Sequence, residues 1–186
     1  MRLFIAVELP EPVREELNQC VVKLKVSEAD IRWVKTENFH VTLKFLGSVE
    51  EAKLSSVMDE LEKISRRSKP FVARLSSLGG FSQVTDPQII WAGIGEGHEA
   101  FEKLEKLIDE SMKGLEFQTG DRTFTAHVTL GRARSKKNIE KISHAIQEQA
   151  FVSYYTFEVN EITLFESITR PSGPIYRVVE RFSIFK

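Results

Sequence analysis

The sequence contains the tetrapeptide His-Val-Thr-Leu twice, at residues 40–43 and at residues 127–130, and this repeat constrains the fold more than any other feature. Around each copy, the spacing of apolar residues predicts the same order of elements: strand, helix, strand, helix, strand. The first set covers residues 2–78, with helices predicted over residues 11–25 and 51–66. The second set covers residues 88–165, with helices predicted over residues 98–113 and 136–149 and strands over residues 88–94, 124–131 and 151–165. One more strand over residues 175–185 closes the chain. The stretch between the sets, GGFSQVTDP at residues 79–87, is the strongest loop pattern in the sequence and marks the seam. The chain is therefore predicted to be an internal duplication.

Duplicated units of this kind tend to pack about a pseudo-two-fold axis, because each copy then buries the equivalent face of the other. Elements that are equivalent in sequence then face each other across a cleft. A chain of 186 residues forms one compact domain or two small lobes. We therefore interpret residues 1–186 as one domain that is made of two duplicated lobes.

The composition is that of an ordinary soluble protein. Hydrophobic residues make up 41% of the chain, and 26 basic residues nearly balance 27 acidic ones. A net charge of −1 argues against a protein that coats nucleic acid indiscriminately, but it leaves room for a local basic patch. No apolar stretch approaches the roughly 20 residues that span a bilayer, and the N-terminal apolar run is too short for a signal peptide. We expect a cytoplasmic monomer that does not enter a membrane.

The repeated tetrapeptide places a histidine and a threonine on one face of a strand, because residues i and i+2 share a face. In the first copy His40 and Thr42 share one face. The apolar residues Val41, Leu43 and Phe45 take the other, which we predict to be the core face. The second copy repeats this arrangement. A duplicated core pattern accounts for the Val and the Leu, but it gives no reason to keep an imidazole and a hydroxyl, so we interpret the His-Thr pairs as functional.

Two imidazoles that face each other across a cleft suit acid–base catalysis. Histidine titrates near pH 6.5, so one copy can be neutral and accept a proton while the other is protonated and donates one. The hydroxyls of Thr42 and Thr129 can donate hydrogen bonds to the non-bridging oxygens of a phosphate between His40 and His127. Two histidines without nearby carboxylate or thiolate partners are a poor set of metal ligands, so we expect no metal and no other cofactor. From the residues alone, the roles of acid and base are interchangeable.

Paired H-x-T-x motifs resemble the two-histidine (2H) phosphoesterase superfamily, and most closely the RNA 2′,3′-cyclic phosphodiesterases, also called 2′-5′ RNA ligases, of bacteria and archaea. The likeness covers nearly the whole chain. It is carried by RLFIAVELP (2–10), RWVKTENFHVTLKFLGSV (32–49), FTAHVTLGRAR (124–134) and ITLFESITRPSGPIYRVVERF (162–182). The chain departs from the family at Ala126, where relatives often have proline, and this change leaves the chemistry of the motif untouched.

The resemblance implies an α+β fold of two lobes, with two pseudo-two-fold-related antiparallel sheets, outer helices and a central cleft. It also implies metal-independent hydrolysis of a terminal RNA 2′,3′-cyclic phosphate to a 2′-phosphomonoester. Carried over by motif, His40 is the proton donor to the departing 3′ oxygen and His127 is the proton acceptor that activates water, while Thr42 and Thr129 hold the phosphate. Run in reverse with a 5′-hydroxyl as the nucleophile, the same site would join RNA ends, such as tRNA halves, through a 2′-5′ bond.

Residues near the two motifs are candidates for binding the rest of the substrate. Basic residues gather after the second motif, where Arg132 and Arg134 lie, and Lys44 belongs to the first motif region, so a phosphate-bearing end would be attracted there. Relatives often carry an arginine at the position of Arg132. Tyr176 and Phe81 are aromatic residues that could stack a terminal base.

Two other functions remain open from the sequence. The first is a phosphodiesterase that acts on 2′-5′ oligonucleotides or on a small cyclic phosphate, because the pocket walls that select the substrate are not visible in the motifs. The second is a protein that binds RNA ends without turnover. Substitution of the two motif histidines distinguishes catalysis from binding alone.

Overall fold

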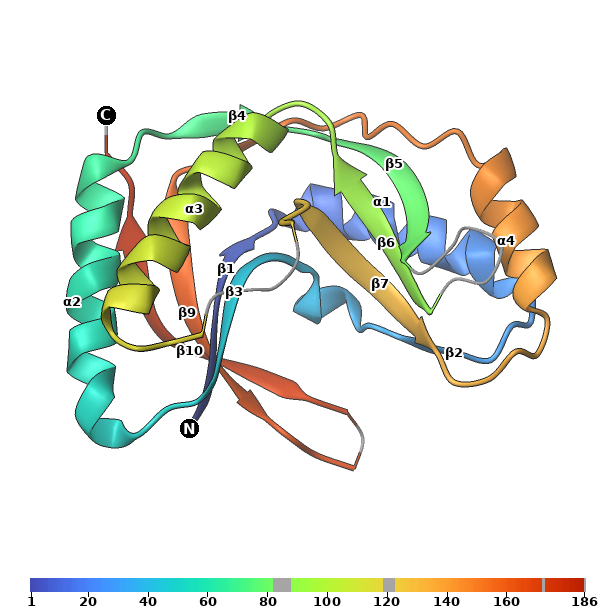
Figure 1. The fold of residues 1–186 in the computed structure, drawn as a ribbon. Helices are drawn as coiled ribbons and strands as arrows, with labels where there is room; N and C mark the ends of the chain where they lie inside the picture. Colours follow the sequence, from blue (N-terminus) through green and yellow to red (C-terminus); the bar gives the residue numbers. More distant parts are fainter. Residues whose placement is uncertain (82–87, 119–122, 172, 186) are drawn as a thin grey trace.

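The structure, a computed structural model, describes residues 1–81, 88–118, 123–171 and 173–185 and has the form of two lobes side by side (Figure 1). The elements follow one another as β1 (Arg2–Glu8), α1 (Glu11–Lys25), β2 (Ile31–Trp33), a short 3-10 helix η1 (Thr36–Asn38), β3 (His40–Ser48), α2 (Glu51–Arg67), β4 (Phe71–Ala73), β5 (Leu75–Phe81), β6 (Ile89–Ile94), α3 (His98–Gly114), β7 (His127–Ala133), α4 (Ile139–Glu148), β8 (Phe157–Val159), β9 (Glu161–Ile168) and β10 (Ile175–Ser183). The α+β class expected from the sequence is confirmed.

The described strands form two antiparallel sheets. The larger has eight strands and runs in the order β10-β9-β1-β3-β7-β6-β5, with β2 also paired to β7, and its two halves meet at the repeated tetrapeptides; β4 and β8 form the smaller sheet. In the described chain, β3 and β7 are joined by a single antiparallel pair, Val41 with Val128. These valines occupy the same position in the two copies of the tetrapeptide, so the pseudo-two-fold axis passes between them. The motif strands therefore lie next to each other at the centre of the molecule (Figure 1).

Each half of the sequence contributes elements to the lobe built by the other half. β5, which ends the first half, pairs with β6, and β9, from the second half, pairs with β1. The helices cross over in the same way. α1 packs near η1 and α4, whereas α3 packs against β3 and α2. Figure 1 shows the result, with α2 and α3 in one lobe and α1 and α4 in the other.

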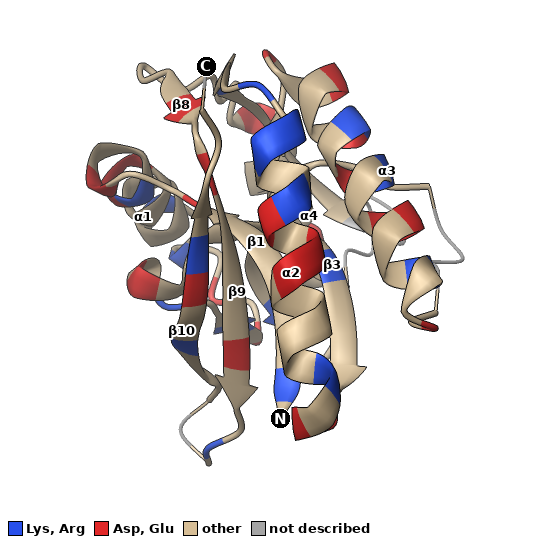
Figure 2. Ribbon diagram, turned by 90° about the vertical axis from the view of Figure 1, so that its left-hand side faces the viewer, with Lys and Arg blue, Asp and Glu red and all other residues tan. Residues whose placement is uncertain are grey.

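The helices bury one apolar stripe each, as their spacing predicts. In α3 the buried residues are Phe101, Leu104, Ile108 and Met112, which recur every three or four positions and thus lie on one side. The opposite sides are charged, and Figure 2 shows Lys, Arg, Asp and Glu interspersed along the outer surfaces of α2 and α3. No helix among the described residues is long and apolar enough to span a membrane.

Several predicted boundaries were wrong. The second motif strand begins at His127 rather than at residue 124, and α4 begins at Ile139 rather than at residue 136. The loop expected from residue 79 begins later, because β5 continues through Phe81 with Gly79 paired to Trp91. A Cβ at Gly79 would lie 2.3 Å from the Trp91 ring, so this glycine makes room for an indole on the next strand rather than for a turn. The strand expected over residues 151–165 forms only from Phe157 onward, in β8 and β9. The remainder of the predicted seam, residues 82–87, lies outside the described residues.

Candidate active site

The two motif strands share an irregularity that the sequence pattern does not reveal. In each strand the first four residues, His-Val-Thr-Leu, alternate between half-buried and buried. The fifth residue is buried like the leucine before it, and the sixth is exposed, so the alternation breaks after the leucine. The register explains this break in alternation. Ile5 pairs with Lys44 and Ala6 with Thr42, so Leu43 is an extra residue in β3. The equivalent Leu130 is the extra residue in β7. Each motif therefore carries a β-bulge at its leucine.

The bulge moves the residue five positions after each histidine onto the histidine face. In β3 that residue is Phe45, and its side chain is 69% exposed. Our prediction that Phe45 lies on the core face with Val41 was therefore wrong, because strict alternation fails at the bulged Leu43. In β7 the equivalent residue is Arg132, which is also exposed. An aromatic ring and a guanidinium thus occupy equivalent places beside the two histidines.

His40 is held in one orientation by two hydrogen bonds. Its Nδ1 lies 2.7 Å from the carbonyl oxygen of Asn38, and its Nε2 lies 2.9 Å from Oγ1 of Thr42. A carbonyl oxygen only accepts hydrogen bonds, so Nδ1 carries the proton and Nε2 is the nitrogen that exchanges one. In the neutral ring, the Thr42 hydroxyl donates to Nε2. The His-Thr pairing read from the sequence is thus a direct contact in the first motif.

His127 has the same arrangement on the other strand. Its Nδ1 lies 2.6 Å from the carbonyl oxygen of Thr125, two residues earlier, as in the first motif. This bond again assigns the proton to Nδ1, so Nε2 is the nitrogen that can accept a proton. The Trp91 ring stands against the imidazole with 6.4 Å between ring centroids. Both histidines are therefore oriented by the backbone carbonyl two residues before them, just ahead of the strand that each histidine begins.

Burial lowers the pKa of both imidazoles in the folded protein. The pKa of His40 falls to about 4, chiefly because the ring loses solvent; the Asn38 carbonyl partly opposes this fall, and repulsion from His127 adds to it. Burial also lowers the pKa of His127, and the positive charge of Arg132 acts in the same direction. A positive charge on His127 therefore opposes the protonation of His40.

Two cavities adjoin the histidines. The larger has a volume of about 580 Å³ and lies between the lobes, with Thr42, His127, Thr129 and Arg132 in its wall. The smaller, of about 190 Å³, has His40 and Tyr176 in its wall. The larger cavity thus brings together both threonines and one histidine of the predicted site. His40 lines the smaller cavity, and its hydrogen bond to Thr42 joins it to a residue in the wall of the larger one.

An aromatic cluster surrounds His40 and supplies much of its burial. The ring centroid of Phe4 lies 5.1 Å from that of His40 and 5.1 Å from that of Phe165. Tyr176 meets His40 edge to face at 5.4 Å, so this residue, predicted to stack a terminal base, lies against the histidine of the first motif. Phe45 forms the outer edge of the cluster, 5.9 Å from Phe4, and lines the larger cavity. Our sequence reasoning missed Phe45, because only the bulge brings it to this face.

Lys44 lies in the wall of the larger cavity, but its charge is already neutralised. It is 7% exposed, its ammonium forms a buried ion pair with Asp109 of α3, and it donates a 2.9 Å hydrogen bond to the carbonyl of Gln118. This partnership links the motif strand to a helix of the same lobe. The predicted contact between Lys44 and a phosphate would require the ammonium to leave Asp109 or to share it.

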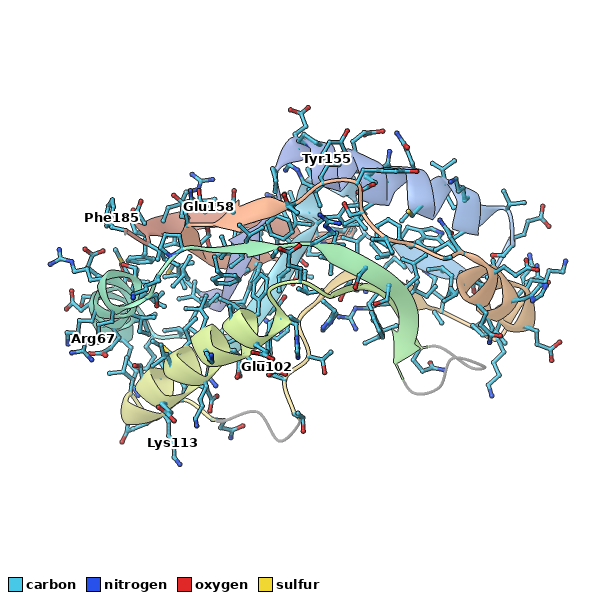
Figure 3. All side chains as sticks on the ribbon, turned by 90° about the horizontal axis from the view of Figure 1, so that it is seen from above. Arg67, Glu102, Lys113, Tyr155, Glu158 and Phe185 are labelled. Carbon is cyan, nitrogen blue, oxygen red and sulfur yellow. The ribbon has the colours of Figure 1, made fainter. Side chains whose placement is uncertain are left out.

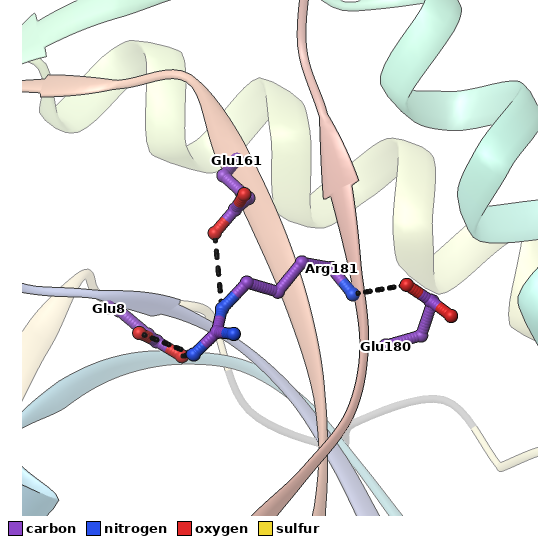
Figure 4. A network of polar contacts seen from close by, with 4 residues as sticks. All are labelled: Glu8, Glu161, Glu180 and Arg181. Carbon is purple, nitrogen blue, oxygen red and sulfur yellow. Dashed lines mark hydrogen bonds and ion pairs between the residues drawn. The ribbon is translucent and has the colours of Figure 1, made fainter.

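The remaining predicted residues divide between the site and its surroundings. Arg134 is exposed just beyond the end of β7, and its backbone N–H donates to Asp30. Phe81 ends β5, and its side chain lies outside the described residues. Beside the smaller cavity, Arg181 of β10 pairs with Glu8 at 3.1 Å and with Glu161 at 3.4 Å (Figure 4). These ion pairs join β10 to β1 and β9 next to His40.

Comparisons with known proteins agree with this site. A family model described as LigT-like phosphoesterase matches residues 7–91 and 94–176. A protein of Methanocaldococcus jannaschii named RNA 2′,3′-cyclic phosphodiesterase is 32% identical over 98% of this chain and 100% of its own length. A protein of the same name from Archaeoglobus fulgidus is 32% identical over 98% of this chain and 99% of its own. The chain therefore belongs to the LigT-like phosphoesterase family, and the resemblance stated from the two motifs is confirmed.

Solved structures show the same fold. A Thermus thermophilus protein of 28% sequence identity superposes with a TM-score of 0.84, covering 99% of this chain and 98% of that one. Escherichia coli LigT in its apo form superposes with a TM-score of 0.79 at 24% identity, covering 100% of this chain and 98% of that one. The two-lobed arrangement is thus shared with these relatives.

Proposed function

We propose that this protein hydrolyses the 2′,3′-cyclic phosphate at the end of an RNA to a 2′-phosphomonoester, with His40 as acid and His127 as base. The observation that carries the proposal is the matched pair of imidazoles. Each has its Nδ1 proton bound to a backbone carbonyl, which makes Nε2 the nitrogen that exchanges a proton, and the charge of one imidazole opposes protonation of the other. The names of the relatives described above support the same substrate.

In the proposed reaction, His127 Nε2 takes a proton from a water molecule as the water oxygen attacks phosphorus. The bond from phosphorus to the 3′ oxygen breaks, and His40 Nε2 gives its proton to that oxygen. A 2′-phosphate and a free 3′-hydroxyl remain. Thr42 and Thr129, both in the wall of the larger cavity, donate hydrogen bonds to the non-bridging oxygens, where negative charge increases in the transition state.

Substrate binding must itself prepare the acid. Because His40 is neutral at pH 7 in the empty site, the proton that it donates has to be stabilised by the bound phosphate. An anion within a few ångströms favours the charged imidazolium and raises its pKa toward neutrality. The phosphate would therefore both accept the hydrogen bonds of the site and recruit the catalytic proton.

The same groups would also run the reaction with a 5′-hydroxyl in place of water. Proton transfers to His127 and from His40 would then form a 2′-5′ phosphodiester and free the 3′-hydroxyl. The reverse of that step would cleave a 2′-5′ linkage and regenerate the cyclic phosphate, which is the second candidate activity. The equivalence of the two imidazoles favours it, since acid and base exchange roles in the reverse direction. A tRNA half as the cellular substrate, a monomeric state and a cytoplasmic location stay predictions.

The test is hydrolysis of a short RNA that ends in a 2′,3′-cyclic phosphate, with EDTA present and the product isomer identified. We expect a 2′-phosphate, and we expect His40→Ala and His127→Ala each to lower kcat by about 10² to 10⁴. His144→Ala, which removes an exposed histidine of α4, is the matched control. Unchanged hydrolysis in both motif variants would overturn the catalytic roles, and loss of activity in EDTA would overturn the metal-free mechanism. Binding without turnover in the parent protein would identify an RNA-end binding protein instead.

A further inference from the structure

Two arginines lie directly opposite each other beside the site. Arg32 of β2 and Arg132 of β7 are register partners in the antiparallel pairing of these strands. Directly opposite residues have Cβ atoms about 4.5–5.5 Å apart on the same face of a sheet. Both side chains are exposed. Like charges in such positions are destabilising, so this pair costs stability unless an anion lies between the guanidinium groups.

Neither arginine has an acidic partner of its own in the structure as described. The ion pairs and side-chain hydrogen bonds found between described residues include neither Arg32 nor Arg132. In contrast, Arg66, Arg177 and Arg181 each pair with a glutamate. The carboxylates in the wall of the larger cavity are Glu105 and Asp109, which come from α3 and interact with Lys44. The two guanidinium groups are therefore available to a ligand.

The arginine pair is directed toward the catalytic groups. The charges of Arg132 and Arg32 both act on the hydroxyl of Tyr176, which stands against the ring of His40. Arg132 also acts on His127 and lines the larger cavity. The pair thus lies within electrostatic range of both sides of the site, with Arg132 in the wall of the larger cavity and Arg32 on the neighbouring strand β2.

The spacing along β7 separates this pair from the reacting phosphate. Arg132 follows His127 by five residues, which corresponds to roughly 15 Å of extended strand. A phosphate bound at the histidines and the two threonines therefore lies some way along β7 from the backbone of Arg132, while the Arg132 side chain lines the same cavity. A phosphate one nucleotide away is better placed, and guanidinium groups bind phosphate oxygens in paired hydrogen bonds.

We propose that Arg32 and Arg132 together bind a second phosphate, the phosphodiester that precedes the terminal nucleotide of the RNA. This proposal rests on the function proposed above and deepens it, because it names the substrate class. An oligonucleotide with a cyclic phosphate end carries that phosphodiester, whereas a 2′,3′-cyclic mononucleotide lacks it. The arginine pair therefore selects polymer ends over free cyclic nucleotides.

The test compares two substrates, adenosine 2′,3′-cyclic phosphate and the dinucleotide ApA with a 2′,3′-cyclic phosphate end. In the parent protein, kcat/KM should be higher for the dinucleotide by about tenfold or more, the usual value of hydrogen bonds to a charged group. Arg32→Gln should remove most of that advantage and leave hydrolysis of the mononucleotide within about twofold. Because Arg32 is on an exposed strand position, the variant should fold, and circular dichroism checks this.

Arg67→Gln makes the same change of charge at an exposed position on α2, far from β2 and β7, and is the matched control (Figure 3). It should preserve the preference for the dinucleotide. Salt provides a second readout, because each phosphate contact on a single strand contributes about 0.7 to the slope of log affinity against log salt concentration. Arg32→Gln should lower this slope for the dinucleotide and leave it unchanged for the mononucleotide.

The outcomes separate this proposal from the one on which it rests. A parent protein that hydrolyses both substrates with equal kcat/KM overturns the second phosphate site and leaves the cyclic phosphodiesterase activity standing. Equal losses for both substrates in Arg32→Gln would show that the arginines bind the reacting phosphate, and would also overturn the site. A parent protein that hydrolyses neither substrate overturns the proposed function and the substrate selection with it.

Discussion

The depressed pKa of His40 makes the stability of the protein depend on pH in a defined window. In the unfolded chain this histidine binds a proton as the pH falls through 6.5, whereas in the folded protein it stays neutral until about pH 4. Between these values the unfolded state holds more protons, so acid favours unfolding. The full contribution is present above pH 6.5 and is lost by pH 4. A fall in pKa of this size corresponds to about 3 kcal/mol of unfolding free energy.

Urea unfolding between pH 7.5 and pH 4 in the parent and in His40→Gln measures this effect. Glutamine stays neutral throughout, so the stability of the variant should decline less on acidification, and the difference between the two curves should change by about 3 kcal/mol. The carboxyl groups contribute to both curves and cancel in the comparison, and the coupling of His127 to His40 is the smallest of the causes that shift the pKa of His40. His144→Gln, which removes an exposed histidine, is the control and should follow the parent.

Parallel curves for the parent and His40→Gln between pH 6.5 and pH 4 would refute the reasoning. They would mean that the aromatic cluster around His40 does not desolvate the imidazole enough to oppose its protonation. The requirement that the substrate phosphate must raise the pKa of the acid would then lose its basis. A titration of His40 by NMR, without and with 2′-AMP bound, would locate the pKa directly and should show it rising in the complex.

Three further predictions concern the site and its supports. The pH profile of kcat/KM should be bell-shaped with its optimum below pH 6.5, because burial lowers the pKa values of both histidines in the free enzyme. The profile of kcat should lie at higher pH, because the bound anion raises these pKa values. Coincident profiles would contradict this reasoning. Lys44→Met should lower the free energy of unfolding in urea by about 3 to 5 kcal/mol, because it leaves Asp109 without its partner. Combining Lys44→Met with Asp109→Leu should recover part of this loss. An equal loss in the double variant would show that the ion pair itself is unimportant. Gly131→Ala should cost about 1 to 3 kcal/mol, because its Cβ would lie 2.6 Å from a methyl group of Ile31; an unchanged melting temperature would show that β2 can yield.

The sequence predicted the elements well where each part of the chain signals its own structure. The helices over residues 11–25, 51–66 and 98–113 match α1, α2 and α3 to within one residue, because the apolar spacing reflects the single face that each helix buries. The prediction of secondary structure failed where a contact with a distant part of the chain sets the local conformation. Gly79 and Gly80 resemble a turn in the sequence, yet they continue β5 because Trp91 occupies the space beside Gly79.

The candidate site was predicted from the repetition of His and Thr, and the structure adds what repetition cannot express. Each motif leucine is a bulge, so the residue five positions after the histidine turns to the histidine face. Strict alternation along the strand therefore assigned Phe45 to the core face. For the same reason, it could not explain how Arg132 reaches the cavity beside His127. The pairing of Arg32 with Arg132 is equally invisible in the sequence, since it joins strands one hundred positions apart.

By itself, the sequence determined which groups are available and how they pair locally. The i, i+2 spacing of His40 with Thr42 guarantees one face, and duplication guarantees a second copy. Only the tertiary structure decided that the two copies meet at Val41 and Val128, that burial makes both imidazoles neutral in the empty site, and that Lys44 is committed to Asp109. The physical reason is that alternation and spacing are properties of a few neighbouring residues. Register, bulges, desolvation and charge pairing arise from contacts between segments that are distant in the chain.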